Sequence, residues 1–378
     1  MRNFLLIALA LALLPCPGLP AWTAPETLSP AAGGRWNVCY NFASAVTADA
    51  ENNLHAVFFE EPGKRVYYRR YDRAAASWDP ALRLDEYGGR DAALTLGSDG
   101  TLHVFFKSRR ALCYRRRSPD GDWSDPYYLR IDDRTPGFPS PLPLPDGDVA
   151  VAMVAERAHT PPAEIWLTTW RRATDVFDPP VRLSDDPVKS GAWMPTLAIH
   201  EGDLHVVWRD DRSGEFDLYG RVKRGANWME TARLTDDPAR TYHPRLAVDP
   251  EGVLRLFFMD RRNGNPAIWE KEWTGEGWTA ERVLFDGGAE AHHPTTVRTT
   301  DGRSLLFWED TRETPGAEIS YAVFSDGAWS KARRISDSPE KASVHTSAAV
   351  TPDGEVVVVY AEEGEILLQR LAPGGLPQ

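Results

Sequence analysis

The chain has 378 residues, a formal net charge of −12 and three cysteines, and 42% of its residues are hydrophobic. An acidic chain without a dominant basic tract is a poor candidate for binding nucleic acid. Three cysteines are too few to staple a small disulfide-rich scaffold, so the fold must depend on a hydrophobic core.

Residues 1–21 are typical of a secretory signal peptide. Arg2 supplies a positive charge, residues 4–14 form an unbroken apolar run, and Ala21 is a small residue at the expected cleavage position. The apolar run is too short to cross a bilayer, and no later segment is long enough to do so. We therefore expect no transmembrane segment and a secreted or periplasmic protein that begins at Trp22.

An aromatic residue recurs about every fifty residues along the chain. The spacings between successive copies are 56, 45, 54, 51, 50 and 51 residues, and each copy begins a short segment that ends in an aliphatic residue. A fixed period of this length indicates a repeat architecture in which each unit buries its faces against its neighbours. The copies are Trp22, Trp78, Trp123, Phe177, Trp228, Trp278 and Trp329.

Each repeat contains three short apolar or alternating runs separated by turn residues, and the recurrent aromatic residue opens a fourth run. No window has the sustained 3.6-residue period of a helix. Four short antiparallel strands repeated around an axis form a β-propeller. The sequence therefore predicts an all-β fold, a seven-bladed β-propeller of four-stranded antiparallel blades. The repeats begin near Asn37, Arg90, Gly137, Gly191, Tyr242, His292 and Ser343.

The seventh repeat has only three strands, at 344–350, 356–360 and 365–371. The missing fourth strand matches residues 22–29, where WTAPETL has the same form as WTAERVL of the fifth repeat. We expect this N-terminal strand to close the last blade and to remove an open edge. Residues 22–375 would then form a single propeller, and 376–378 a tail.

Two turn motifs give the chain a family resemblance. Ser118-Pro-Asp-Gly-Asp-Trp123 and Ser325-Asp-Gly-Ala-Trp329 resemble shortened Asp-boxes, and three repeats carry Asp-x-Arg before an aromatic residue. The chain thus resembles the secreted bacterial sialidase-like (BNR/Asp-box repeat) β-propellers. The resemblance implies a fold and a carbohydrate-related setting. The Arg-Ile-Pro motif of sialidases is absent and sialidases have six blades, so sialic-acid hydrolysis is not expected.

Histidines occupy one repeat position in three consecutive repeats. Nine residues before the turn glycine stand Ala43, Asp91, Phe138, Trp193, His243, His293 and His345. We expect His243, His293 and His345 to converge at the channel mouth with Trp193 beside them. Imidazoles suit proton transfer near neutral pH and bind divalent metals. The alternative is structural, because a ring at this position could pack over the strand entry with its nitrogen bonded to a carbonyl.

Further polar residues are expected on the same face. Tyr242, His292 and Arg245 adjoin the histidines. The Asp-x-Arg pairs lie in the loops between the second and third strands. Their recurrence in register favours a turn-forming role over direct substrate contact, since aspartate accepts backbone donors in turns. The pairs are Asp210 and Arg212, Asp260 and Arg262, and Asp310 and Arg312.

The leading hypothesis is a secreted propeller that recognises an extracellular or cell-surface glycan at this mouth, either with or without processing it. His243, His293, His345 and Tyr242 are the catalytic candidates. The substrate-binding candidates are Trp193, Arg245, Asp210, Asp260, Arg262, Asp310 and Arg312.

Two alternatives stay open for the function. One is a propeller-type polysaccharide lyase that uses His and Tyr as base and acid, and the other is a non-catalytic protein-interaction scaffold. The sequence requires no cofactor, although the three histidines could hold a divalent metal. We further expect a monomer and, because export favours oxidation, a disulfide between Cys39 and Cys113.

Overall fold

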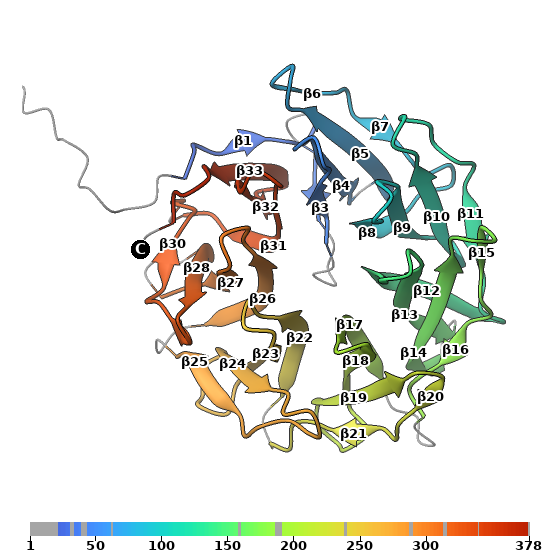
Figure 1. The fold of residues 1–378 in the computed structure, drawn as a ribbon, viewed down its shortest axis with the longest axis vertical. Helices are drawn as coiled ribbons and strands as arrows, with labels where there is room; N and C mark the ends of the chain where they lie inside the picture. The colour runs from blue at the N-terminus through green and yellow to red at the C-terminus, as the bar shows by residue number, and fades with distance from the viewer. Residues whose placement is uncertain are drawn as a thin grey trace, which may run out of the picture.

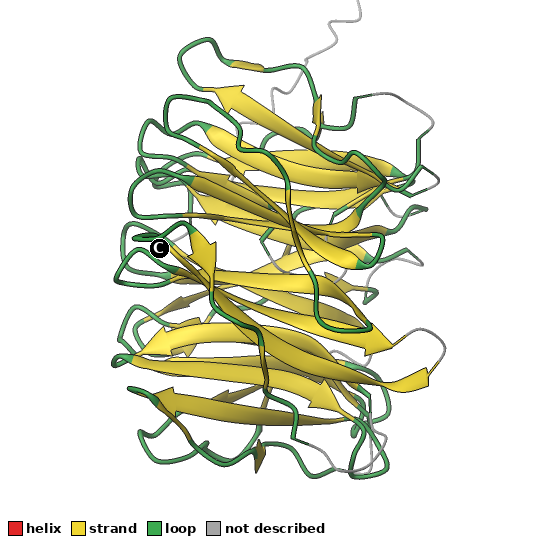
Figure 2. Ribbon diagram, turned by 90° about the vertical axis from the view of Figure 1, so that its right-hand side faces the viewer, coloured by secondary structure: helices red, strands yellow, loops and turns green. Residues whose placement is uncertain are grey.

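The computed structural model describes residues 22–30, 34–38, 44–61, 63–157, 160–185, 191–237, 240–286, 290–312, 316–338 and 340–376. The side chains of residues 160–162 are not described either. The expected signal peptide lies outside these ranges. Seven small antiparallel sheets surround a central axis (Figure 1), and in side view the strands run obliquely across the ring (Figure 2). The predicted seven-bladed propeller is confirmed.

The blades follow one another in chain order. The first four are β2 (Trp36–Asn37) with β3 (Val46–Ala48), β4 (Leu54–Glu60), β5 (Arg65–Asp72), β6 (Ser77–Trp78) and β7 (Leu82–Arg83); β8 (Arg90–Leu96), β9 (Leu102–Ser108), β10 (Ala111–Arg117) and β11 (Tyr127–Leu129); β12 (Arg134–Pro143), β13 (Val149–Arg157), β14 (Thr160–Arg171), β15 (Val176–Phe177) and β16 (Val181–Arg182); and β17 (Ala192–His200), β18 (Asp203–Asp210), β19 (Asp217–Arg224), β20 (Asn227–Trp228) and β21 (Ala232–Arg233).

The last three blades complete the ring. They are β22 (Thr241–Val248), β23 (Leu254–Asp260), β24 (Ala267–Glu272) and β25 (Arg282–Phe285); β26 (Ala291–Arg298), β27 (Ser304–Asp310), β28 (Glu318–Ser325), β29 (Ala328–Trp329) and β30 (Arg333–Arg334); and β31 (Ser343–Val350), β32 (Val356–Glu362), β33 (Glu365–Leu371) and β1 (Glu26–Thr27).

The second strand of each blade is largely apolar because a neighbouring blade covers each of its faces. Every residue of β23, β27 and β32 is buried. Hydrophobic clusters fill each of the seven interfaces between adjacent blades, including the interface between the last blade and the first. The core is therefore a ring of interfaces, as expected for a repeat protein.

The fourth strand is less regular than the sequence predicts. In the first, third, fourth and sixth blades it is split into two pieces of two residues each, which pair with the third strand on either side of a break. In the first blade Asp79 and Pro80 lie in the break. A proline offers no backbone N–H to a sheet ladder, so a break at this outer edge costs little.

The N-terminal segment closes the ring as predicted. Glu26 and Thr27 pair with Leu368 and Leu367 of β33, and the Leu28 N–H donates to the Ile366 carbonyl at 2.7 Å. Trp22 forms a bridge with Leu371, and its indole meets the Tyr321 ring of the sixth blade edge-on at 5.6 Å. In Figure 1, β1 lies beside β33, although the two are far apart in sequence.

Two further expectations concern the end of the propeller and the cysteines. Leu376, expected in a tail, is buried in the core between the sixth and seventh blades, so packing extends one residue further.

Cys113 has a free, buried thiol between the first and second blades. This finding does not support the expected disulfide with Cys39, which lies outside the described residues. The described chain has no helix long and apolar enough to cross a membrane.

Closure by the N-terminus predicts that its buried anchor stabilises the whole ring. Leu28 is fully buried, so Leu28→Ala should lower the free energy of unfolding by about 2–5 kcal/mol. Thr27→Ala, at an exposed position of the same strand, is the matched control and should change it little. Urea unfolding of both variants measures the difference. Equal stability of the two variants would mean that the N-terminal strand does not hold the ring closed.

Candidate functional site

The first strand of each blade lines the central channel, and six of these strands carry the same irregularity. Where the strand enters the blade, the register shifts by one residue, so that two residues oppose one on the second strand. Such a bulge re-aims a side chain. One residue of each bulge has a positive φ of 50–58°: Asp91, Phe138, Met194, His243, His293 and His345. Ala43 lies outside the described residues.

The fourth blade corrects one prediction. The bulge residue is Met194 rather than Trp193, because the hairpin segment between the paired residues Thr196 and Val207 is one residue shorter than the segment between Arg245 and Phe257 in the fifth blade. Counting back from the turn glycine therefore misplaces this blade by one residue. Trp193 precedes the bulge, as Tyr242 does in the fifth blade, and its ring meets Phe138 of the third blade at 5.8 Å. The described contacts do not bring Trp193 to the histidines.

The three predicted histidines do converge. The rings of His243 and His293 meet edge-to-face with centroids 4.0 Å apart, and those of His293 and His345 are 5.8 Å apart. His292 joins the group at 5.7 Å from His293. Burial, followed by the nearby His293 and Arg209, holds the pKa of His243 well below its usual value, and burial lowers the pKa of His345 to about 4. Both are neutral imidazoles at neutral pH.

A buried carboxylate organises this cluster. Glu309, on β27, lies 2.5 Å from Nδ1 of His293 and accepts the His345 N–H at 2.7 Å. Burial alone would raise the pKa of Glu309, but the interactions with His293 and His345 outweigh it, so this pKa lies below its usual range. His345 also pairs through Nδ1 with the Asn37 side chain at 2.8 Å. The Glu309 carboxylate thus links His293 of the sixth blade to His345 of the seventh blade.

A tyrosine and an arginine extend the cluster toward the fourth blade. The Tyr242 ring lies 5.9 Å from His243 and 5.5 Å from Phe216. The Arg209 guanidinium lies over both of these neighbouring aromatic rings, 5.0 Å from Tyr242 and 4.1 Å from Phe216. Burial lowers the pKa of Arg209 to about 10, which still leaves it charged at neutral pH. Its charge is held by aromatic faces, as in a cation–π site.

Arg245 lines the channel below the histidines. It lies on β22 two residues beyond His243 and borders a cavity of about 260 Å³ with Ser44, Ser140 and Thr196. The channel therefore carries a second guanidinium beneath the cluster of imidazoles. Two cationic groups near one mouth favour an anionic ligand.

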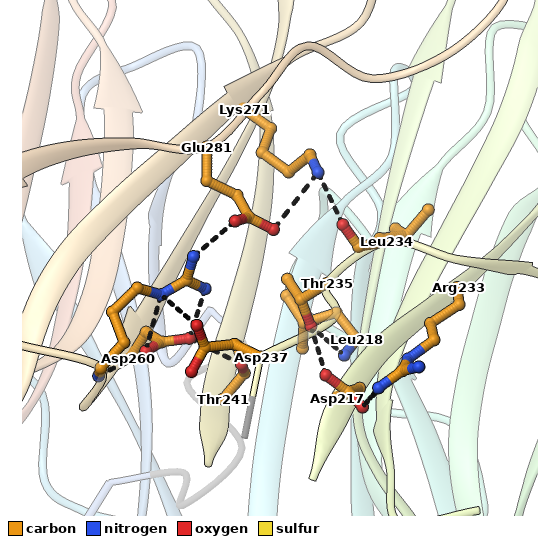
Figure 3. Close-up of polar contacts among 11 residues, drawn as sticks. Asp217, Leu218, Arg233, Leu234, Thr235, Asp237, Thr241, Asp260, Lys271 and Glu281 are labelled. Atoms are coloured by element: carbon orange, nitrogen blue, oxygen red, sulfur yellow. Dashed lines mark hydrogen bonds and ion pairs between the residues drawn. The ribbon is translucent and has the colours of Figure 1, made fainter. Parts of the chain in front are cut away.

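The Asp-x-Arg pairs have the geometry of the structural alternative. Asp260 is fully buried and accepts the Arg262 N–H at 2.8 Å and the Thr241 hydroxyl at 2.8 Å, while the Arg262 side chain returns to Asp260 and reaches Glu281 (Figure 3). Each aspartate closes its turn and pairs with the arginine two residues later. The equivalent pairs are Asp210 with Arg212 and Asp310 with Arg312.

The histidines are not arranged as a metal centre. Within the described ranges, no group of three or more His, Cys, Asp or Glu side chains could hold a metal ion. The rings pack against one another, whereas metal ligation requires donors directed at one point. The arrangement suits acid–base chemistry and anion binding.

Asp91 is the bulge residue of the second blade. Its carboxylate is fully buried, and among the residues that the structure describes neither oxygen has a hydrogen-bond partner. Arg90 lies at an ion-pair distance of 3.5 Å. Burial raises the pKa of Asp91 to about 6, so the group titrates close to neutrality. A strained backbone and a perturbed pKa are features of functional positions.

Sequence reasoning missed Arg209 and Glu309. Both lie on the second strand opposite the residue before the bulge, where Arg209 pairs with Trp193 and Glu309 with His292. One signal was available, because WRD, FMD and WED occur at the same point of three repeats and only the middle residue changes in charge. When the residues on either side keep their type and only the middle residue changes charge from repeat to repeat, the fold does not require one side chain there. Such a position is a candidate for a functional residue.

No family model and no curated protein matches the sequence, whereas solved structures share the fold. A PL25 ulvan lyase bound to GlcA(1-4)Rha3S has a TM-score of 0.64 at 12% identity, covering 89% of this chain and 93% of its own. The polysaccharide lyase Uly1 has a TM-score of 0.59 at 10% identity, covering 92% and 94%.

A more distant enzyme class shares the fold as well. The GH93 α-L-arabinofuranosidase of Fusarium graminearum, in complex with arabinobiose, has a TM-score of 0.55 at 15% identity and covers 74% of this chain and 92% of its own. At such identities the likeness shows the propeller fold alone. This fold is shared by polysaccharide lyases and glycosidases.

The buried Asp91 predicts a pH-dependent stability. Its folded pKa of about 6 exceeds the unfolded value of roughly 4, so its contribution is favourable at low pH and is lost as the pH rises through the folded pKa. Asp91→Asn should therefore stabilise the protein at pH 7 by up to about 3 kcal/mol and leave it unchanged at pH 4. Urea unfolding at both pH values, with Asp120→Asn as exposed control, measures this. An equal effect of Asp91→Asn at the two pH values would contradict a pKa of Asp91 that is raised by burial.

Proposed function

We propose that the protein is a polysaccharide lyase that cleaves an extracellular, uronate-containing polymer by β-elimination at the channel mouth. The observation that carries this proposal is the contiguous group of His243, Tyr242 and Arg209, with His293 and Arg245 beside it. β-Elimination at a uronate needs a neutral base, a proton donor and a cation for the carboxylate, and these side chains supply all three.

His243 is the proposed base. Its depressed pKa keeps the imidazole neutral, so that it can take the proton from C5 of the uronate. His293 packs against it and is oriented by Glu309. A positioned base contributes roughly 10²–10⁴-fold to a rate. Arg209 and Arg245 bind the uronate carboxylate, which lowers the cost of the negative charge that develops when C5 loses its proton.

Tyr242 is the proposed acid. Its hydroxyl gives a proton to the glycosidic oxygen as the C4–O bond breaks, and the electrons of the C5–H bond form the C4=C5 double bond. His243 gains one proton and Tyr242 loses one, so proton exchange with solvent restores the site. The products are a new reducing end and an unsaturated uronate, and no water is consumed.

The fold supports the proposal without deciding the substrate. The two lyases described above share the propeller over nearly their whole length, and one was solved with a glucuronate-containing ligand. The signal-like N-terminus would deliver the protein to the compartment where such polymers occur. Glycan recognition without cleavage and a protein-interaction scaffold are the outcomes against which the proposal is tested.

The activity test follows the ultraviolet absorbance of the unsaturated uronate. Ulvan and other uronate polysaccharides should give rising absorbance with the wild-type protein. His243→Ala and Tyr242→Phe should each lower kcat/KM by about 10²-fold or more. His200→Ala, at the end of β17 far from the channel mouth, should leave it unchanged. Retained activity in the first two variants would refute their roles.

Binding measurements separate the remaining functions. Retention of glycans on an array without turnover of any uronate polymer would establish a binding module in place of a lyase. Absence of both would favour a protein-interaction scaffold.

The base also predicts the pH profile. Because burial depresses the pKa of His243, the proton-accepting form persists below the ordinary imidazole pKa of about 6.5. The acid limb of kcat/KM should therefore fall only well below pH 6.5. A profile that loses half its activity at pH 6.5 or above would indicate a solvated base and contradict the assignment.

A further inference from the structure

A histidine and a tyrosine form a recurring pair within the first two blades. In the first blade the Tyr68 hydroxyl lies 2.7 Å from Nδ1 of His55, and in the second the Tyr114 hydroxyl lies 2.9 Å from Nδ1 of His103. The histidine is the second residue of its strand, and the tyrosine is on the third strand. Each pair ties together two strands of one blade.

The tyrosine of this pair fills the interface with the next blade. The Tyr114 ring lies 5.1 Å from Phe177 and 6.3 Å from Trp170 of the third blade, and His103 meets Trp170 at 4.7 Å. Tyr68 similarly meets Trp123 of the second blade at 4.9 Å. The ring is therefore held between a histidine of its own blade and aromatic side chains of the following blade.

The interface between the fourth and fifth blades keeps this arrangement but lacks the tyrosine. His205 meets Trp273 at 4.9 Å, and Trp273 meets Trp278 at 5.4 Å. The strand register puts Gly220 opposite Val207, just as Tyr68 is opposite Val57 and Tyr114 opposite Phe105. The other four blades have Leu167, Glu270, Tyr321 and Leu368 at this position. A glycine thus stands where every other blade has a large side chain.

A cavity occurs where the tyrosine is missing. It has a volume of about 330 Å³ and is lined by His205, Gly220, Trp273, Trp278 and Leu234, among others. Apolar cavities of roughly 150 Å³ bind benzene, and ligand sites commonly begin near 300 Å³. Lys271 at its edge is engaged, since Nζ donates to the Leu234 carbonyl at 2.6 Å and pairs with Glu281 (Figure 3). The cavity can therefore hold a small aromatic molecule.

His205 supplies a polar group on the inner wall of this cavity, whose lining also includes the charged residues Arg221, Arg224, Glu230, Arg233, Lys271 and Glu276. Its side chain is 2% exposed, and burial lowers its pKa to about 4, so the ring is a neutral imidazole with one donor and one acceptor nitrogen. Across the described chain, no residue forms a hydrogen bond with this ring. His55 and His103 have a phenol hydroxyl at this point, so the hydroxyl of a ligand in the cavity would give His205 the partner that its counterparts have.

We propose that this cavity binds a small phenol, whose ring takes the position of the missing tyrosine ring and whose hydroxyl forms a hydrogen bond with His205. The site is separate from the candidate active site. His205 lies at the beginning of the second strand, at the end of the blade opposite the His243 cluster, which lies where the first strand enters. Binding of the phenol would fill the interface between the fourth and fifth blades and stabilise the ring.

The probe is 4-methylphenol, which is the tyrosine side chain as a free molecule. Calorimetric titration of the full chain should show saturable binding with one site per chain, accompanied by a change in tryptophan fluorescence. Toluene, which lacks the hydroxyl and so cannot form the hydrogen bond with the imidazole, should bind about tenfold more weakly, a difference of about 1.4 kcal/mol. His205→Phe should reduce the affinity for 4-methylphenol to that for toluene.

Two further variants make the test specific. His103→Phe makes the same substitution where Tyr114 already fills the interface, and it should leave 4-methylphenol binding unchanged. Gly220→Tyr restores the side chain of the repeat and should abolish binding. A Cβ there would lie 3.1 Å from Leu234 Cδ1, so circular dichroism checks that this variant folds. Absence of saturable binding to the wild type, equal affinity for toluene, or unchanged affinity in His205→Phe would each overturn the proposal.

Discussion

A blade of this protein can bury its second strand only by packing against both of its neighbours. All residues of β23, β27 and β32 are buried. Exposing either face of such a largely apolar strand to water would cost free energy. The ring must therefore be closed, because an open first or last blade would expose an apolar face and a free edge. Residues 22–28 meet this requirement by supplying the outer strand of the last blade. The geometry of the channel mouth depends on this closure, since His345 and its partner Asn37 lie on the two blades that meet there.

Within the closed ring, fixed and variable positions have different tasks. The buried aspartates of the Asp-x-Arg turns hold the loops in the same way in three blades. The bulge residues, by contrast, share a backbone conformation but range from aspartate through phenylalanine and methionine to histidine. A constant backbone with a changing side chain lets one scaffold present different chemistry around the channel. Imidazoles gather on the fifth to seventh blades, and Arg209 with its aromatic neighbours on the fourth and fifth.

Much of the fold followed from the period of one aromatic residue, because that residue opens the outer strand of nearly every blade. The convergence of His243, His293 and His345 followed from a shared offset, since equivalent positions of adjacent blades must be neighbours. The offset failed at Trp193, where a hairpin segment one residue shorter than in the fifth blade moved the equivalence to Met194. Arg209, Glu309 and the cavity at Gly220 depend on which residues face each other across strands. Strand pairing is a tertiary property that the spacing of motifs along one chain does not specify.

The lyase proposal requires the mouth of this propeller to break a glycosidic bond by elimination. Mass spectrometry of the products from a defined uronate oligosaccharide tests it most directly, because elimination and hydrolysis differ by one molecule of water. Elimination should give two fragments whose masses add up to that of the intact oligosaccharide, with the C4=C5 double bond on the fragment that carries the new non-reducing end. Fragments whose summed mass exceeds that of the substrate by one water would show hydrolysis and contradict the roles assigned to His243 and Tyr242.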